Sequence, residues 1–290
     1  MSLKTVFCIG YDTECVADLS VSLKAVEVVA AVHRKHGAPA TFFFVGQLLE
    51  AQGERYAAAL GEDNLFDIQS HTYSHYGLKG NAPEHVARAA EELQKTADLI
   101  DEHFGKRPIG VCGPGGYENG LQDCPNMLRV LWDSGARYIS TDGRGPGGTI
   151  PSPLTQPYWY AEQGFPTLLE LPAQDFHENV LKGYQSVPAQ WPPILPWGLP
   201  NRPPTTPDEE FAYFRQALDY CVQQGVPYYR TYYHPWSVYR FHPEARTIDL
   251  LLNHAHHIGA EVTSCTRYYH QLSGEADAKC GSCDETRLRV

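Results

Sequence analysis

The stretch Ser70-His71-Thr72-Tyr73-Ser74-His75 sets two imidazoles four residues apart. Two such rings face the same point if the segment makes one helical turn, which is one way a protein presents two nitrogens to a metal ion. The spacing alone is weak evidence, because 13 histidines in 290 residues give roughly half of one such pair by chance. Its meaning depends on which side chains stand at the ends of the other strands.

Bulk composition restricts the classes of protein to consider. Of the 290 residues, 42% are hydrophobic and 20% are charged, which is ordinary for a folded globular protein. The formal net charge of -11 leaves no basic surface for phosphate groups, so we expect neither a nucleic-acid nor a membrane partner. The apolar run Val6–Ile9 is too short for a signal segment, and the eight cysteines are scattered, so we expect a cytoplasmic protein with reduced thiols.

Signals for strands and helices alternate along the chain. Strands are expected over residues 4–11, 40–45, 65–69, 108–112, 136–140, 167–171, 228–233 and 260–263. Helices are expected over residues 21–36 with Ser20 as cap, 47–60, 83–104, 121–134, 208–224, 244–257 and 266–272. This alternation predicts a single α/β domain with a parallel sheet and helices packed outside it.

One long segment departs from this pattern. Residues 143–207 form an excursion rich in proline and tryptophan, with one expected strand at 167–171. Its aromatic content argues against disorder, and the excursion either packs on the body of the domain or helps to shape the site. Residues 274–290 are expected to form a C-terminal tail, where Cys280 and Cys283 stand as a single Cys-x2-Cys pair.

Reactive side chains recur where the expected strands end. They are Asp12, Glu14, His71, His75, Cys112, Asp142 and His234. If the strands close into a barrel, the loops after them open on one face. Two histidines and one carboxylate are the three protein ligands of a catalytic zinc that keeps a position for water. A further carboxylate can take a proton, and a histidine across the cleft can protonate a leaving group.

The order of these motifs resembles the polysaccharide deacetylases, the NodB-homology or carbohydrate esterase family 4 group. The resemblance runs from about Val6 to Thr263, and residues 38–46 match that family's second strand. It implies a distorted TIM-like (β/α)7 barrel over residues 1–273 and a divalent metal, usually zinc. It also implies hydrolysis of an N-acetyl amide or another C–N amide bond in a carbohydrate or small molecule.

The resemblance assigns a role to each matching residue. Asp12 corresponds to the general base and Glu14 to the acidic metal ligand, with Asp12 as the ligand left as an alternative. His71 and His75 correspond to the other two ligands, and His234, followed by proline as in the family, to the general acid. Tyr117 and the backbone amides up to Gly116 stand where an oxyanion would be stabilised.

Two positions depart from the family. Cys112 occupies the place of an arginine that orients the base, and no residue cleanly matches the aspartate that tunes the acid histidine. Asp142 or Asp175 is a candidate for that aspartate, and Arg144 for the missing guanidinium. These departures favour branches of the family that cleave cyclic imides and small amides over those acting on chitin or peptidoglycan.

Other classes of function stay open on the sequence. The missing arginine motivates a catalytically impaired protein that binds a sugar or small ligand on the same barrel. Redox regulation through Cys280 and Cys283 is a weaker hypothesis. The aromatic loops suggest self-association as a homo-oligomer.

Overall fold

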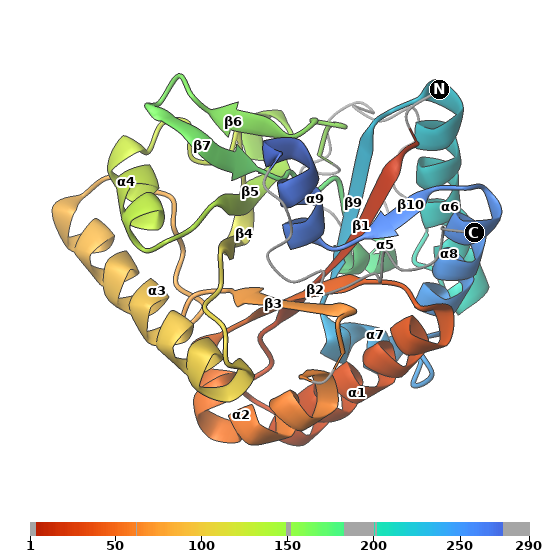
Figure 1. Ribbon diagram of the computed structural model, residues 1–290. Helices are drawn as coiled ribbons and strands as arrows, with labels where there is room; N and C mark the ends of the chain where they lie inside the picture. The colour runs from red at the N-terminus through yellow and green to blue at the C-terminus, as the bar shows by residue number, and fades with distance from the viewer. Residues whose placement is uncertain (1–3, 62, 149–151, 183–199, 201, 275–290) are drawn as a thin grey trace, which may run out of the picture.

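The fold is built around β1 (Val6–Thr13), a strand whose eight residues are all buried. It pairs in parallel with β2 (Ala40–Phe44) on one side and with β9 (Tyr228–Tyr233) on the other. A parallel strand covered on both faces needs a nearly continuous apolar sequence, which the N-terminal run supplies. Strand β1 therefore lies inside the sheet, with paired strands on both sides (Figure 1).

The computed structural model describes residues 4–61, 63–148, 152–182, 200 and 202–274. The other strands are β3 (Phe66–Ser70), β4 (Gly110–Glu118), β5 (Tyr138–Arg144), β6 (Tyr158–Tyr160), β7 (Phe165–Glu170), β8 (Asp175–Phe176) and β10 (Glu261–Thr263). The helices are α1 (Leu19–His36), α2 (Gly46–Leu60), α3 (Pro83–Phe104), α4 (Pro125–Asp133), α5 (His177–Lys182), α6 (Pro207–Gln224), α7 (Pro235–Phe241), α8 (Arg246–His257) and α9 (Cys265–Ser273), with a 3-10 turn η1 (Pro146–Gly148).

The sheet closes into a barrel through residues 165–176. Strand β7 pairs with β5, and β8 pairs with β9. In the short segment between them, the Leu171 N–H donates to Ile139 at 2.8 Å and the Gln174 N–H donates to Arg230 at 3.0 Å. Together β7 and β8 thus fill the position between β5 and β9, and the ring follows the order β1, β2, β3, β4, β5, β7 with β8, β9. The expected α/β barrel-like fold in a single domain is confirmed.

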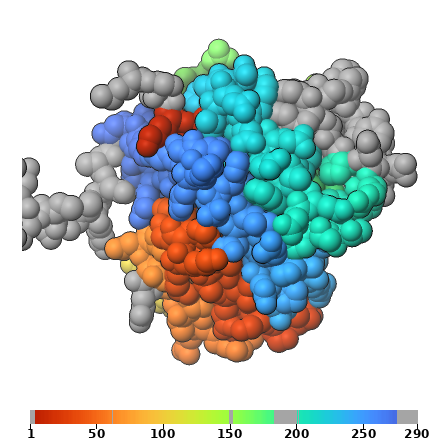
Figure 2. Space-filling model, turned by 90° about the vertical axis from the view of Figure 1, so that its right-hand side faces the viewer, coloured from red at the N-terminus to blue at the C-terminus, as the bar shows by residue number. Residues whose placement is uncertain are grey.

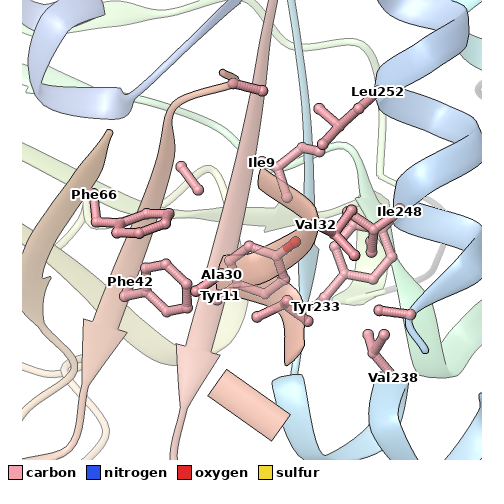
Figure 3. Packing of buried hydrophobic residues seen from close by; sticks show 14 of the residues in the cluster. Ile9, Tyr11, Ala30, Val32, Phe42, Phe66, Tyr233, Val238, Ile248 and Leu252 are labelled. Carbon is pink, nitrogen blue, oxygen red and sulfur yellow. The ribbon is translucent and has the colours of Figure 1, made fainter. Parts of the chain in front are cut away.

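Helices cover the outside of the barrel and one of its ends. Helices α1, α6 and α8 bring the N-terminal and C-terminal parts of the chain side by side on one face (Figure 2). Between them and the strands lies the main core, where the Tyr11 and Phe42 rings stack with centroids 4.9 Å apart (Figure 3). Helix α9 packs against buried residues from the start of β1 and so covers the N-terminal end of the barrel. The catalytic groups expected from the sequence lie toward the opposite end.

Several element boundaries differ from those expected. Helix α1 begins at Leu19 because the carboxylate of Asp18, and not Ser20, caps it by accepting from the Val21 N–H at 3.1 Å. Helix α4 begins only at Pro125 and α8 only at Arg246, while α7 was not expected. Strand β4 continues through the glycines expected as a loop, with Gly115 and Gly116 at positive φ.

The Pro/Trp-rich excursion contributes more to the barrel than expected. Its described part holds β6, β7, β8 and the short helix α5, where a single strand was expected. The Trp159 ring packs against Tyr269 of α9 with centroids 6.2 Å apart. Trp191, Trp197, Cys280 and Cys283 lie outside the described residues, so the tail boundary at 274 stays a prediction. In the described part of the chain, no helix has the length and apolar character needed to cross a membrane.

The stability of the fold should fall in mild acid because of His33. This buried ring contacts the Ala38 carbonyl through Nδ1 at 3.0 Å and Tyr11 Oη through Nε2 at 2.8 Å. Burial lowers its pKa to about 4 from an ordinary 6.5. Between these two pH values the unfolded chain binds a proton at His33 and the folded chain does not. The free energy of unfolding should therefore fall by about 3 kcal/mol as the pH falls from about 6.5 towards 4.

Denaturant unfolding of the wild type and of His33→Gln across this pH range checks the expectation. The variant should be less stable near neutral pH but less sensitive to acid, because glutamine does not titrate. Equal pH slopes for the two proteins would assign the acid sensitivity to other groups.

Candidate metal centre and active site

The strand ends bring the predicted residues to one end of the barrel. Tyr11 of β1 lies in register with Tyr233 of β9, so Asp12 and His234 are neighbours across two paired strands. Glu14 follows β1 directly, and His71 follows β3. The carboxyl ends of parallel strands meet at a common edge, which is why residues over 200 positions apart share one site.

The carboxylate of Glu14 is the centre of the site. Its Oε2 lies 2.7 Å from His75 Nε2 and 3.3 Å from His71 Nε2. Its other oxygen, Oε1, lies 3.0 Å from His234 Nε2. Burial opposes ionisation of Glu14, but the imidazoles of His234, His71 and His75 beside its two oxygens hold the pKa of its carboxyl well below its usual range. Three imidazoles therefore converge on one carboxylate.

His71 and His75 do not converge through a helical turn, as the spacing suggested. The segment is irregular, and Thr72 and His75 have positive φ angles of 62° and 61°. Thr72 Oγ1 accepts from the Tyr76 N–H at 2.7 Å, and Glu92 of α3 accepts from both the backbone and the hydroxyl of Ser74 at 2.7 Å. This tight turn, held by side chains, brings the two rings to a centroid distance of 5.1 Å.

The donor atoms of Glu14, His71 and His75 fit a divalent metal. One donor atom from each lies within 4.8 Å of the others. His71 Nε2 and Glu14 Oε2 are buried and make no hydrogen bond in the described part of the chain. The opposite nitrogen of His71, Nδ1, lies 2.9 Å from the Cys112 carbonyl, which fixes the tautomer that leaves Nε2 free as a ligand. Two imidazole nitrogens and one carboxylate oxygen suit zinc.

Asp12 lies beside this centre and belongs to a different group. Its carboxylate clusters with His71 and Cys112, and all three residues are buried. Asp12 Oδ1 makes no hydrogen bond among the described residues. Of the two acids, Glu14 is the one that groups with both histidines, and Asp12 presents a free oxygen.

The carboxylate that contacts the other ring nitrogen of His234, Nδ1, belongs to Glu178, which sequence reasoning missed. Glu178 Oε1 lies 2.9 Å from His234 Nδ1. Burial lowers the pKa of His234, but the charge of Glu178 and the hydrogen bonds of Glu14 and Glu178 raise it well above its usual value. Glu178 follows the two-residue strand β8 inside the Pro/Trp-rich excursion, where no periodic signal marks it.

Asp142 and Asp175, the two candidates for this partner, are engaged elsewhere. Asp175 accepts from Tyr213 Oη at 2.7 Å and from Tyr229 Oη at 2.6 Å. Asp142 accepts from Tyr158 Oη at 3.2 Å, and burial raises its pKa to about 6. The sequence hypothesis that one of them pairs with the histidine is therefore wrong.

Arg144 also lies away from the base. It donates to the Gly115 carbonyl through Nε at 3.1 Å and through Nη2 at 2.9 Å. The guanidinium beside Asp12 and Cys112 belongs instead to Arg230 of β9, a fully buried residue that sequence reasoning missed. A single arginine within an aromatic strand could have drawn attention, because arginine is rarely buried in full.

A small pocket is lined by Asp12, and a wider groove shares two of its lining residues. The small pocket, of about 20 Å³, has room for about one water molecule. It is lined by Asp12, Cys112, Gly113, Gly115, Gly116, Ser140, Thr141, Asp142, Gly143, Ala173 and Tyr232. The wider groove, of about 880 Å³, shares Gly115 and Gly116 with it and adds Lys79, Tyr117 and Arg144. Tyr117 Oη accepts from the Leu78 N–H at 2.8 Å, so its hydroxyl is bonded to the loop before α3.

The polysaccharide deacetylase family model matches residues 21–123. The family resemblance is confirmed. The matched span contains His71 and His75, whereas Asp12, Glu14 and His234 lie outside it. Curated proteins offer no match to this sequence.

Several solved structures share the fold across nearly the whole chain. A structure from Mycobacterium smegmatis, described as a polysaccharide deacetylase, is 17% identical with a TM-score of 0.64, covering 94% of this chain and 92% of the other. The Puue allantoinase is 15% identical with a TM-score of 0.64, covering 96% and 93%. A family 4 pseudoenzyme from Bacillus anthracis is 14% identical with a TM-score of 0.53, covering 93% and 66%. At these identities the likeness shows the fold alone.

Proposed function

We propose that this protein is a metal-dependent hydrolase that cleaves a C–N amide bond. The observation that carries the proposal is the cluster of Glu14, His71 and His75, with His234 on the other side of the same carboxylate. A buried oxygen and a buried nitrogen without hydrogen-bond partners are expected of ligands prepared for an ion. Metal sites of this composition occur in hydrolases.

Glu14, His71 and His75 would hold the ion, which we propose to be zinc. When bound, such an ion polarises a carbonyl oxygen and lowers the pKa of a coordinated water towards about 7. The Cys112 carbonyl fixes the ring of His71, and the turn anchored by Glu92 fixes the segment that carries His75. The protein thus supplies ligands already oriented for the ion.

The chain's own residues would move the protons. Asp12 has a free buried oxygen next to His71 and would accept the proton of the attacking water. His234 would donate a proton to the departing nitrogen, with Glu178 orienting its ring from Nδ1. The backbone around Gly115 and Gly116 borders the same pocket, where N–H groups could stabilise the oxyanion.

The proposed substrate is a small amide or the amide of a carbohydrate. The pocket at Asp12 admits only a small group, while the adjoining groove accommodates the rest of a substrate. The allantoinase among the structural neighbours favours a small amide, and the family match favours a carbohydrate.

Elemental analysis of the protein as purified, combined with a substrate screen, tests the proposal. The expected result is one zinc or related divalent ion per chain, and release of acetate from N-acetyl sugars or a ring-opened product from cyclic amides. A chain that holds no metal even after incubation with divalent ions would reject the metal centre.

Replacing Glu178 should impair His234 as the proton donor without changing the metal content. In Glu178→Gln the ring of His234 loses a charged partner, so we expect kcat to fall about 10- to 100-fold with metal content unchanged. Elemental analysis and steady-state kinetics measure the two effects. Glu102→Gln, at an exposed position of α3, is a matched control. Unchanged kcat in Glu178→Gln would remove Glu178 from the mechanism.

Cys112 favours a second candidate function, a binding protein that has lost catalysis. The family pattern has an arginine at this position, and one structural neighbour is a pseudoenzyme. In that case the protein would bind an N-acetyl sugar or cyclic amide tightly, with metal restored, and release no product. Calorimetric titration beside the product assay separates the two functions.

A further inference from the structure

The barrel interior holds a buried positive charge that has no assigned role in the hydrolysis proposed for this protein. Arg230 of β9 is completely buried. Its Nη1 donates to Ser140 Oγ and, at 3.4 Å, to the Leu171 carbonyl. Its Nε and Nη2 make no hydrogen bond to any described residue. Burying a charge without full compensation is strongly unfavourable, so these two free donors require an explanation.

The guanidinium extends along the barrel towards Asp12. Arg230 lies in register with Cys8 of β1. A Cβ atom added at Gly10, two residues further along, would lie 2.6 Å from Arg230 Nη2. Side chains two residues apart on a strand share a face, so positions 8, 10 and 12 of β1 point the same way. The guanidinium therefore fills the space beside Gly10, which has no side chain. Asp12 is the next residue on this face of β1, roughly 7 Å further along the strand.

Cys112 links the two groups. Cys112 lies in register with Ser140, which accepts from Arg230 Nη1, and Asp12, Cys112 and Ser140 line the same small pocket. The thiol and the carboxylate lie within 4.8 Å of each other. Asp12 has one oxygen without a hydrogen-bond partner among the described residues, and Arg230 has two such nitrogens. Both groups therefore adjoin Cys112.

We propose that Arg230 is the positioning residue for Asp12, acting across the Cys112 thiol from a different strand than the one where the family pattern has its arginine. The charge of Arg230 holds the carboxylate turned into the barrel, with one oxygen exposed to the small pocket. Gly10 is required because any side chain there would displace the guanidinium. The catalytic consequence of this role rests on the proposed function, whereas the coupling between Asp12 and Arg230 does not.

Kinetics of three variants test the catalytic consequence. Arg230→Met should lower kcat by about 10- to 100-fold, with KM within about twofold and metal content unchanged. Arg230→Lys should recover part of the lost rate because it keeps the charge. Gly10→Ala, whose backbone φ is compatible with alanine, should also lower kcat by pushing the guanidinium aside. Arg107→Met, at an exposed arginine paired with Asp98, is the control.

A double-mutant cycle tests the coupling without any substrate. Denaturation midpoints are compared for the wild type, Asp12→Asn, Arg230→Met and the double variant, all without metal. Coupling predicts a smaller loss in the double variant than the sum of the two single losses. Additive losses would overturn the proposal, as would wild-type kcat in Arg230→Met. Wild-type protein that hydrolyses no amide, combined with a coupled cycle, would reject the proposed function and retain the role of Arg230.

Discussion

His71→Ala and His75→Ala are each expected to lose the bound metal and all measurable turnover. Each substitution removes one of three donor atoms. The two that remain bind a divalent ion too weakly to retain it during dialysis. We expect metal affinity to fall by more than about 100-fold, beyond the range seen when only supporting residues are changed. Elemental analysis after dialysis measures the loss directly.

A matched control makes this experiment specific. His257→Ala removes an exposed histidine at the end of α8 and should retain both metal and activity. His71 is buried and His75 is about half exposed, with side-chain exposures of 1% and 47%. His75→Ala should therefore leave the fold nearly as stable as before, and it is the cleaner of the two variants. Full metal content in both variants would reject these residues as ligands.

Asp12→Asn is expected to retain the metal and lose catalysis. Asparagine keeps the shape of the side chain but cannot accept a proton, so kcat should fall by about 100- to 10,000-fold. The metal should stay, because Glu14 and not Asp12 groups with both histidines. Metal analysis and steady-state kinetics on one preparation give both quantities.

Glu14→Gln is the counterpart that separates the two acids. Loss of metal in Glu14→Gln together with retention in Asp12→Asn assigns Glu14 as ligand and Asp12 as base. The opposite pair of results would exchange the two roles. Asp101→Asn, at an exposed position of α3, controls for the loss of one carboxylate. Wild-type turnover in Asp12→Asn would exclude Asp12 as the base.

The sequence was informative about the fold because its strands are buried on both faces. Runs such as the one that forms β2 contain almost only apolar residues, so their existence and order could be predicted without tertiary information. Their boundaries were less certain, since side-chain caps such as Asp18 and the irregular pairing of β4 decide where an element begins or ends. Short β8 had no signal of its own and is held by its pairing with β9.

By itself the sequence also determined which residues gather at the site. Asp12, Glu14, His71 and His234 follow or end parallel strands, and parallel strands direct their carboxyl ends to one edge. Only the tertiary structure decided how these residues are partnered. The hold of Glu92 on the turn at Ser74, the contact between Glu178 and His234, and the approach of Arg230 to Gly10 join segments with no fixed spacing in sequence. Such contacts depend on the direction of side chains across a closed barrel, and no local pattern of residues encodes that direction.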